Sequence, residues 1–159
     1  RNARRLYEKA AQKNVRAAIK KLELFIDTSK VPSELSSLEL SVRGDDYFYG
    51  RQGYIQDYNE AIKYYYKAAE KGNVIAQNDL GNCLFHGKGC ITNLTQAIIW
   101  YRKAANQGYM YGQFNLAWGY EHGEGIEKNL VEAVKWYKKA AEQGHPQAQK
   151  RIELLQNAM

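Results

Sequence analysis

"WYRKAANQG" (residues 100–108) recurs as "WYKKAAEQG" at residues 136–144 and, with more changes, as "YYYKAAEKG" at residues 64–72. Successive copies begin 36 residues apart, and residues 76–111 and 112–147 are identical at 15 of 36 positions without a gap. A fixed period of this length is typical of stacked helical repeats, in which each unit buries its apolar face only against its neighbours.

Each unit predicts two helices. In the first, Ala76, Leu80 and Gly81 fall on one face of a helical wheel, and Leu116 and Ala117 repeat that face one unit later. The second helix contains the nine-residue motif. Its rings and alanines share a face and are predicted to interdigitate between layers; they are Trp100, Tyr101, Ala104 and Ala105, with Trp136, Tyr137, Ala140 and Ala141 in the next unit.

Turn and capping residues mark the helix ends at the same period. The glycine pairs of "HGKGC" (86–90) and "HGEGI" (122–126) predict a chain reversal with positive φ. Asx residues followed three positions later by Glu or Gln predict the start of each second helix; the pairs are Asp57 with Glu60, Asn93 with Gln96, and Asn129 with Glu132. Gly72, Gly108 and Gly144 are predicted to end these helices.

These residues carry a family resemblance. The patterns A-x-x-x-L-G at 76–81, G-x-G at 87–89 and A-x-x-W-Y-x-K-A-A-x-x-G at 97–108 resemble the Sel-1-like repeat, a relative of the tetratricopeptide repeat. The resemblance implies an all-α fold, a right-handed superhelical solenoid of antiparallel helix pairs.

The same register divides the chain into five parts, expected to form one continuous solenoid. These are a partial repeat with an irregular link (1–39), three repeats (40–75, 76–111, 112–147) and a C-terminal packing helix (148–159). In the first repeat Gly44 stands where Leu is expected, so its first helix is interpreted as degenerate. Asn14 is expected to end one helix, and Ala18 with Leu22 to begin another. The chain opens on Arg and is expected to be a fragment of a longer array.

Composition and motifs argue against catalysis. The three histidines include His86 and His122 at equivalent positions, and stacked helices about 8–10 Å apart keep two such rings from sharing one metal ion. No Ser or Cys has the surroundings of an activated nucleophile, so we expect no cofactor, no metal and no enzymatic activity. Cys83 and Cys90 are either two free thiols or a local disulfide.

The net charge of +6 permits an anionic partner. Lys67, Lys103 and Lys139 recur on the side of the second helices that is predicted to face solvent, where solubility accounts for them. Nucleic acid is therefore an unfavoured partner, and a basic module binding RNA or another anionic polymer is kept as the alternative. No apolar run approaches the roughly 18 residues that a membrane span needs, so no membrane insertion is expected.

The candidate partner-binding residues lie on the first-helix face predicted to point away from the core. Phe114 and Trp118 are one turn apart on that face, and Trp118→Ala is expected to abolish or greatly weaken binding while leaving the melt nearly unchanged. The other candidates are Glu121 and His122 in the same helix, and Asn78, Asn82, Phe85 and His86 one unit earlier. A packing role for Phe114 and Trp118 against a neighbouring helix is the alternative interpretation.

The family resemblance implies a function for this surface. Proteins resembling Sel-1-like repeats hold other proteins or extended peptides on the concave surface of their first helices, as adaptors in bacterial envelope processes, host-cell infection and endoplasmic-reticulum quality control. We therefore expect a non-enzymatic protein-interaction scaffold, and a bacterial protein that is exported or delivered to a host.

Overall fold

The computed structural model describes residues 2–23 and 26–159, which form eight α-helices and no strand. After α1 (Asn2–Glu23) come α2 (Ser37–Tyr49), α3 (Tyr58–Glu70), α4 (Val74–His86), α5 (Leu94–Asn106), α6 (Met110–His122), α7 (Leu130–Glu142) and α8 (Ala148–Ala158). From α2 onward each helix packs against the next in the chain, as the repeat period predicts. The fold is an all-α solenoid of antiparallel helix pairs.

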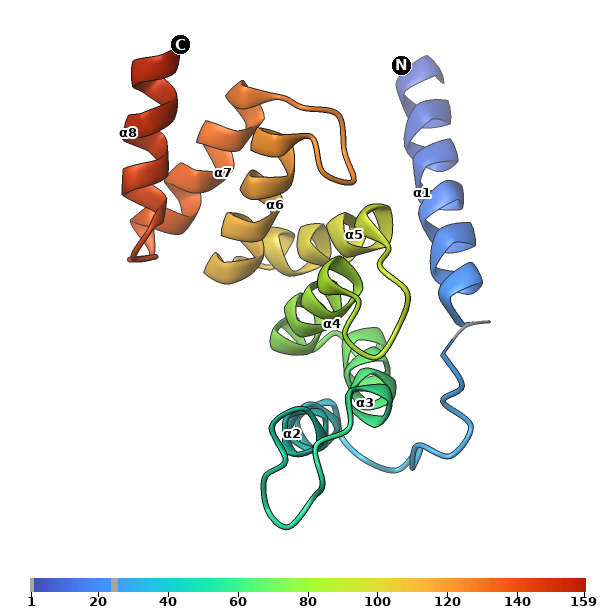
Figure 1. Cartoon of the computed structure of the whole chain (residues 1–159). Coiled ribbons are helices and arrows are strands. Elements are labelled where there is room, and N and C mark those ends of the chain that lie inside the picture. Colours follow the sequence, from blue (N-terminus) through green and yellow to red (C-terminus); the bar gives the residue numbers. More distant parts are fainter. Residues whose placement is uncertain (1, 24–25) are drawn as a thin grey trace.

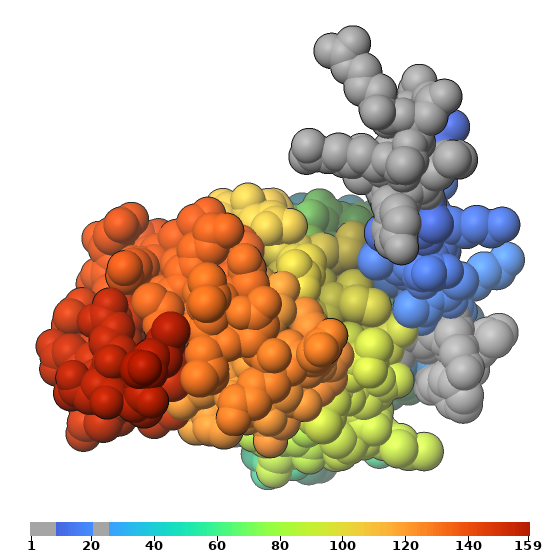
Figure 2. All heavy atoms as spheres, turned by 90° about the horizontal axis from the view of Figure 1, so that it is seen from above, coloured from blue at the N-terminus to red at the C-terminus, as the bar shows by residue number. Residues whose placement is uncertain are grey.

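The helices form a curved array. Figure 1 shows α2, α4, α6 and α8, the first helices of successive units, along the inner side of the curve, with α3, α5 and α7 on the outer side. Seen from above in Figure 2, the units from α4 onward follow one another along the molecule in chain order, ending with α8 in red. The inner face is therefore assembled from segments that lie about 36 residues apart in sequence.

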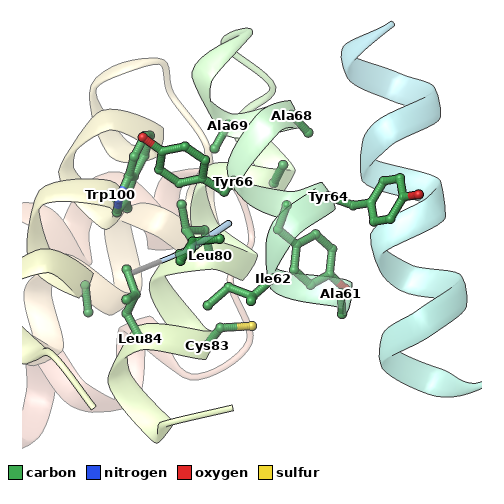
Figure 3. Packing of buried hydrophobic residues seen from close by; sticks show 14 of the residues in the cluster. Ala61, Ile62, Tyr64, Tyr66, Ala68, Ala69, Leu80, Cys83, Leu84 and Trp100 are labelled. Carbon is green, nitrogen blue, oxygen red and sulfur yellow. The ribbon is translucent and has the colours of Figure 1, made fainter. Parts of the chain in front are cut away.

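The repeated motif is a packing unit, as predicted. Trp100 and Tyr101 are buried on α5, and Trp100 meets Tyr66 of α3 edge-on at 6.0 Å between ring centroids. Figure 3 shows these two rings beside Leu80 of α4. Close approach depends on small residues, because a Cβ added to Gly81 would lie 2.6 Å from the ring of Tyr101. Trp136, the equivalent of Trp100, is only half-buried.

The helix ends follow the sequence signals. The Asx side chains of Asp57, Asn93 and Asn129 each accept a hydrogen bond from the backbone three residues on. The first helices α2, α4 and α6 each end at a glycine in the left-handed conformation; Gly87, for example, has φ +69°. A complete capping box is present at Ser36 and Glu39, which start α2.

Buried glutamine amides join successive units. Gln77 of α4 accepts from Gln107 at 2.7 Å and donates to the carbonyl of Ala69 at 3.2 Å. One unit later Gln113 does the same with Gln143 and the carbonyl of Ala105. Each amide thus connects the second helix of the preceding unit to the end of the second helix of its own unit.

The interpretation of the first repeat's first helix as degenerate is wrong. Gly44 is equivalent to Gly81, not to Leu80. A Cβ added to Gly44 would lie 2.5 Å from the ring of Tyr65, and a Cβ added to Gly81 would meet the ring of Tyr101 in the same way. The left-handed cap at Gly50 likewise lies 37 residues before that at Gly87. The turn after α2 thus has one extra residue, which shifts the alignment of that helix by one and leaves its 13-residue length unchanged.

The expected helix break at Asn14 is also wrong, because α1 continues through it from Asn2 to Glu23. Asn costs less than Gly in a helix interior and adopts the left-handed conformation of a helix end less readily, so the helix continues through it. The side chain of Leu22 lies outside the described residues. In the link that follows, Ile26 and Val31 are buried against the first repeat, and Lys71 donates to the carbonyls of Ser33 and Leu35.

Candidate functional site

Four positions of each first helix form one stripe on the inner face. They are spaced i, i+4, i+7 and i+11, which places them within a narrow arc of the helix surface. The residues are Leu38, Val42, Asp45 and Tyr49 on α2; Ile75, Asp79, Asn82 and His86 on α4; and Tyr111, Asn115, Trp118 and His122 on α6. All twelve are exposed or half-buried, so they make up a surface that a partner can reach, which we name the inner stripe.

An amide ladder crosses the middle of this stripe. Asn115 of α6 donates to Asn78 of α4 at 2.9 Å and approaches Asn82 at 3.5 Å. Asn82 also accepts from the hydroxyl of Tyr101 at 2.7 Å. One unit earlier Asp45 accepts from Tyr65 in the same way, also at 2.7 Å. The second helices α5 and α3 therefore hold Asn82 and Asp45 in place.

Two aspartates give the α2–α4 end of the stripe a negative character. Burial, with a contribution from the charge of Asp45, raises the pKa of Asp79 to about 7. Among the ion pairs of the described residues, none involves Asp79 or Asp45. In the part of the chain that the structure describes, this end of the stripe thus holds two carboxyl groups that form no ion pair.

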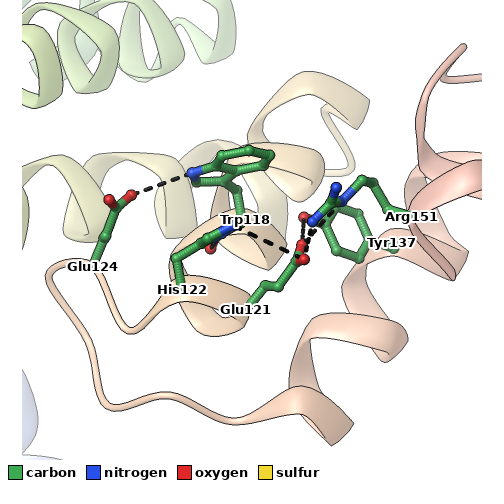
Figure 4. Close-up of polar contacts among 6 residues, drawn as sticks. All are labelled: Trp118, Glu121, His122, Glu124, Tyr137 and Arg151. Carbon is green, nitrogen blue, oxygen red and sulfur yellow. Dashed lines mark hydrogen bonds and ion pairs between the residues drawn. The ribbon is translucent and has the colours of Figure 1, made fainter. Parts of the chain in front are cut away.

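The α6 end is organised around a buried carboxylate. Glu121 accepts from Tyr137 of α7 at 2.6 Å and from Arg151 of α8, which forms an ion pair with it (Figure 4). The guanidinium of Arg151 lies over the ring of Trp118, 5.2 Å from its centroid. Burial raises the pKa of the Tyr137 phenol, so this hydroxyl stays protonated and remains a donor to Glu121.

Trp118 is held on both sides. Its ring stacks on His122 with centroids 4.0 Å apart, and its Nε1 donates to Glu124 in the following turn at 3.2 Å. Figure 4 shows the indole between the carboxylate of Glu124 and the Glu121–Arg151 pair. The ring is half-buried, so part of it is still accessible on the inner stripe.

The structure corrects three of the eight candidate residues. Phe114 is buried, stacked on His145 at 4.1 Å and edge-on to Tyr137 at 5.1 Å. Asn78 and Glu121 are buried as well. The prediction that these three face away from the core is wrong, because side chains from other helices or from the segment after α7 cover each of them. Burial lowers the pKa of His145, consistent with a neutral ring against Phe114.

The other five candidates reach the surface. Asn82, Phe85 and Trp118 are half-buried, and His86 and His122 are exposed. Phe85 lies against the core cluster and beside His86, with which it makes an edge contact at 5.0 Å. Sequence reasoning missed Asp45, Asp79 and Asn115. Asp79 and Asn115 lie 36 residues apart, each one helical turn before the candidates Asn82 and Trp118, and this repeated spacing could have identified them.

The described residues offer no metal centre and no membrane span. No group of three or more His, Cys, Asp or Glu side chains in this part of the chain could hold a metal ion. None of the helices it contains is long and apolar enough to cross a bilayer. Cys83 and Cys90 are free thiols, and burial raises the pKa of both.

Comparison with known proteins agrees with this architecture. The sequence pattern of the Sel1 repeat matches residues 1–15, 43–73, 74–109 and 111–145. The chain belongs to the Sel1 repeat family. Sel1 repeats are typically protein–protein interaction modules and are generally non-catalytic. No curated protein matches the chain.

Two solved Sel1 repeat structures are similar in sequence and fold. One is a protective antigen present in uropathogenic Escherichia coli strains, with 38% identity and a TM-score of 0.69 over 70% of this chain. The other is a Sel1 repeat protein from Oxalobacter formigenes, with 35% identity and a TM-score of 0.71 over 74% of this chain. The matched part spans only 24% and 48% of those two proteins. Cysteine rich protein B of Helicobacter pylori shares the fold, with 22% identity and a TM-score of 0.57. The match covers 74% of this chain and 97% of the Helicobacter pylori chain.

Proposed function

We propose that this Sel1 repeat chain is a non-enzymatic scaffold that binds an extended segment of a partner protein along its inner stripe. The observation that carries the proposal is the amide ladder. It places the side-chain amides of Asn82 and Asn115 side by side from two neighbouring helices, on an accessible surface. Side-chain amides both donate and accept, so they complement the main chain of a peptide that has no hydrogen bonds of its own.

The surroundings of the ladder support a protein partner over an anionic polymer. Asp45 and Asp79 lie at the α2–α4 end, and the positive charge of Arg151 is neutralised by Glu121. Phosphates would meet carboxylates on this face, which is unfavourable. Trp118 adds an aromatic surface of the kind that dominates binding energy at protein interfaces.

We also propose that the protein acts in bacterial envelope or host-interaction processes. The similarity to a protective antigen of uropathogenic Escherichia coli supports this assignment. Its test is localisation: the protein is expressed with an epitope tag in its source organism, and the cells are separated into cytosol, envelope and medium. Recovery of the tag from the envelope or the medium supports the proposal, and recovery from the cytosol alone contradicts it.

Binding along the inner stripe is tested with a random peptide library displayed on phage and selected on the immobilised wild-type protein. Affinities of the selected peptides are then measured for Asn115→Arg on the inner stripe and for Asn106→Arg, a matched change at an exposed site on the outer helix α5. We expect Asn115→Arg to weaken binding by about tenfold or more and Asn106→Arg to leave it unchanged.

Two further results decide between the candidates. Thermal melts show whether both variants remain folded. Equal affinity of folded Asn115→Arg and wild type would place binding away from the ladder. A single-stranded RNA that bound tightly and was released steeply by salt would favour the anionic-polymer alternative.

A further inference from the structure

The net charge of the protein is concentrated at one end of the chain. Residues 1–23 contain eight Lys or Arg and two Glu, which gives +6, the whole net charge of the protein. The residues that follow contain fifteen basic and fifteen acidic side chains and are neutral as a set. Charges that serve solubility are usually interspersed with charges of the opposite sign, so this concentration on α1 indicates a further role.

The helix that carries this charge lies beside the solenoid. Each helix from α2 onward packs against the next one, whereas the largest contact of α1 with another helix is a small one with α5. Ile19 is half-buried against the core, and Val15 and Ala18 are half-buried as well. Figure 1 shows α1 standing next to the array, and Figure 2 shows its blue residues on the side of the molecule opposite α8. One face of α1 thus meets the solenoid, and the other is open to solvent.

The open face carries a row of basic side chains. They are spaced i, i+4, i+7 and i+11, which places them within an arc of about 60° of the helix surface, on the other side from Ile19. In the part of the chain that the structure describes, all four are exposed and none forms an ion pair. We name this set the basic row; its residues are Lys9, Lys13, Arg16 and Lys20.

The shape of the basic row fits a flat anionic surface. A helix that lies on a plane touches it along one line, and the basic row is such a line, about 17 Å long at 1.5 Å per residue. Ala10 and Ala17 stand beside the row, are exposed, and are too small to hold the helix away from the plane. Basic side chains gathered in this way are attracted to the negative surface potential of a bilayer that contains anionic lipids.

The surroundings of the basic row fit nucleic acid less well. A helix in the major groove of a duplex has a phosphate backbone on either side of it. The flanks of the basic row, however, are Gln12 on one side and Ala10 and Ala17 on the other, none of them charged. Single-stranded RNA is held by aromatic rings on which its bases stack, and residues 9–20 contain no aromatic residue. A bilayer surface requires neither charged flanks nor rings.

We propose that α1 attaches the protein to an anionic membrane surface through its basic row, without inserting into the bilayer. The proposal goes beyond the proposed function, because it concerns another face of the molecule and another class of partner. It does not rest on binding by the inner stripe, which lies on α2, α4 and α6.

The probes are vesicles of phosphatidylcholine mixed with phosphatidylserine and vesicles of phosphatidylcholine alone. Co-sedimentation gives the partition coefficient of the whole chain for each kind of vesicle. The test variant removes three charges of the basic row by Lys9→Gln, Lys13→Gln and Lys20→Gln. The matched control removes the same charge at three exposed lysines of the later units by Lys128→Gln, Lys138→Gln and Lys150→Gln. Thermal melts show whether both variants remain folded.

We expect the wild-type protein to bind the vesicles that contain phosphatidylserine, to leave the neutral vesicles unbound, and to be released as the salt concentration rises. The test variant should bind about a hundredfold more weakly, because each basic side chain near an anionic bilayer strengthens binding about fivefold. The control variant should bind within about threefold of wild type, because its lysines lie outside the basic row.

Four results would overturn the proposal. Equal weakening of the two variants would show that total charge, not the basic row, drives binding. Equal binding of wild type to neutral vesicles, or retention at high salt, would show an apolar attachment. Binding to neither kind of vesicle would exclude an anionic bilayer as the partner. Tighter binding of a DNA duplex or a single-stranded RNA through the same three lysines would assign the basic row to nucleic acid.

Discussion

Arg151 of α8 forms an ion pair with Glu121 of α6, thirty residues earlier in the chain. The same carboxylate accepts from Tyr137 of α7, so one buried side chain joins three successive helices. Glu121 is only 9% exposed, so Tyr137 and Arg151, in place of water, donate the hydrogen bonds that stabilise its carboxylate. The C-terminal unit therefore depends on this pair.

We expect Arg151→Met to destabilise the protein. Removing one partner of a buried ion pair leaves an uncompensated charge, at a cost of about 3–5 kcal/mol when both groups are fully buried. Because the side chain of Arg151 is 26% exposed, we expect about 1–3 kcal/mol from urea unfolding. Lys150→Met, an exposed neighbour on the same helix, is the control. Equal midpoints for the two variants would contradict a structural role of the pair.

The contacts of Trp118 alter the expectation for its removal. The sequence predicts that Trp118→Ala weakens binding without changing the melt. The ring, however, stacks on His122, lies under Arg151 and bonds to Glu124. We therefore expect a loss of about 1–3 kcal/mol of stability together with the loss of binding. Trp118→Phe should retain the stacking and recover most of the stability in thermal melts. An unchanged melt for Trp118→Ala would mean that these contacts contribute little.

Enlarging the small residues between units should also destabilise the fold. Ala104 of α5 is fully buried against α6, and a Cβ added to Gly112 would lie only 2.8 Å from its own Cβ. Ala104→Leu adds three carbons where there is no space, so we expect a loss of about 1–3 kcal/mol in chemical denaturation. Ala158→Leu at an exposed site is the control. A neutral Ala104→Leu would show that α5 and α6 can separate without cost.

The raised pKa of Asp79 predicts a pH-dependent stability. The folded protein holds this proton up to about pH 7, whereas the unfolded chain releases it near the ordinary value of 3.8. Stability should therefore fall as pH rises from about 4 to 7, by at most about 4 kcal/mol from this group, and by less with its partial exposure. Asp79→Asn should be more stable than wild type at pH 8, with the difference shrinking towards pH 4. A constant difference across this range would mean that the pKa is ordinary.

The repeat explains how far sequence carries the fold. Trp100, Tyr101 and the alanines after them recur at a period that only a stacked array of helix pairs satisfies, and the Asx and Gly signals mark the helix ends. The one-residue shift at Gly44 escaped this reasoning because an added turn residue changes the register without disturbing the pattern of the following helix.

The candidate site shows what a helical wheel omits. The wheel gives the angle of Phe114 correctly, but not which part of the chain lies at that angle, and His145 from the link between α7 and α8 covers it. The same holds for Glu121, whose charge is buried because Arg151 and Tyr137 reach it from two later helices. By itself the sequence determined the helix pairs, their ends and their order, because those depend on local periodicity and capping. Only the tertiary structure decided which outward positions remain accessible, because burial depends on neighbours that the chain brings together from about one repeat away.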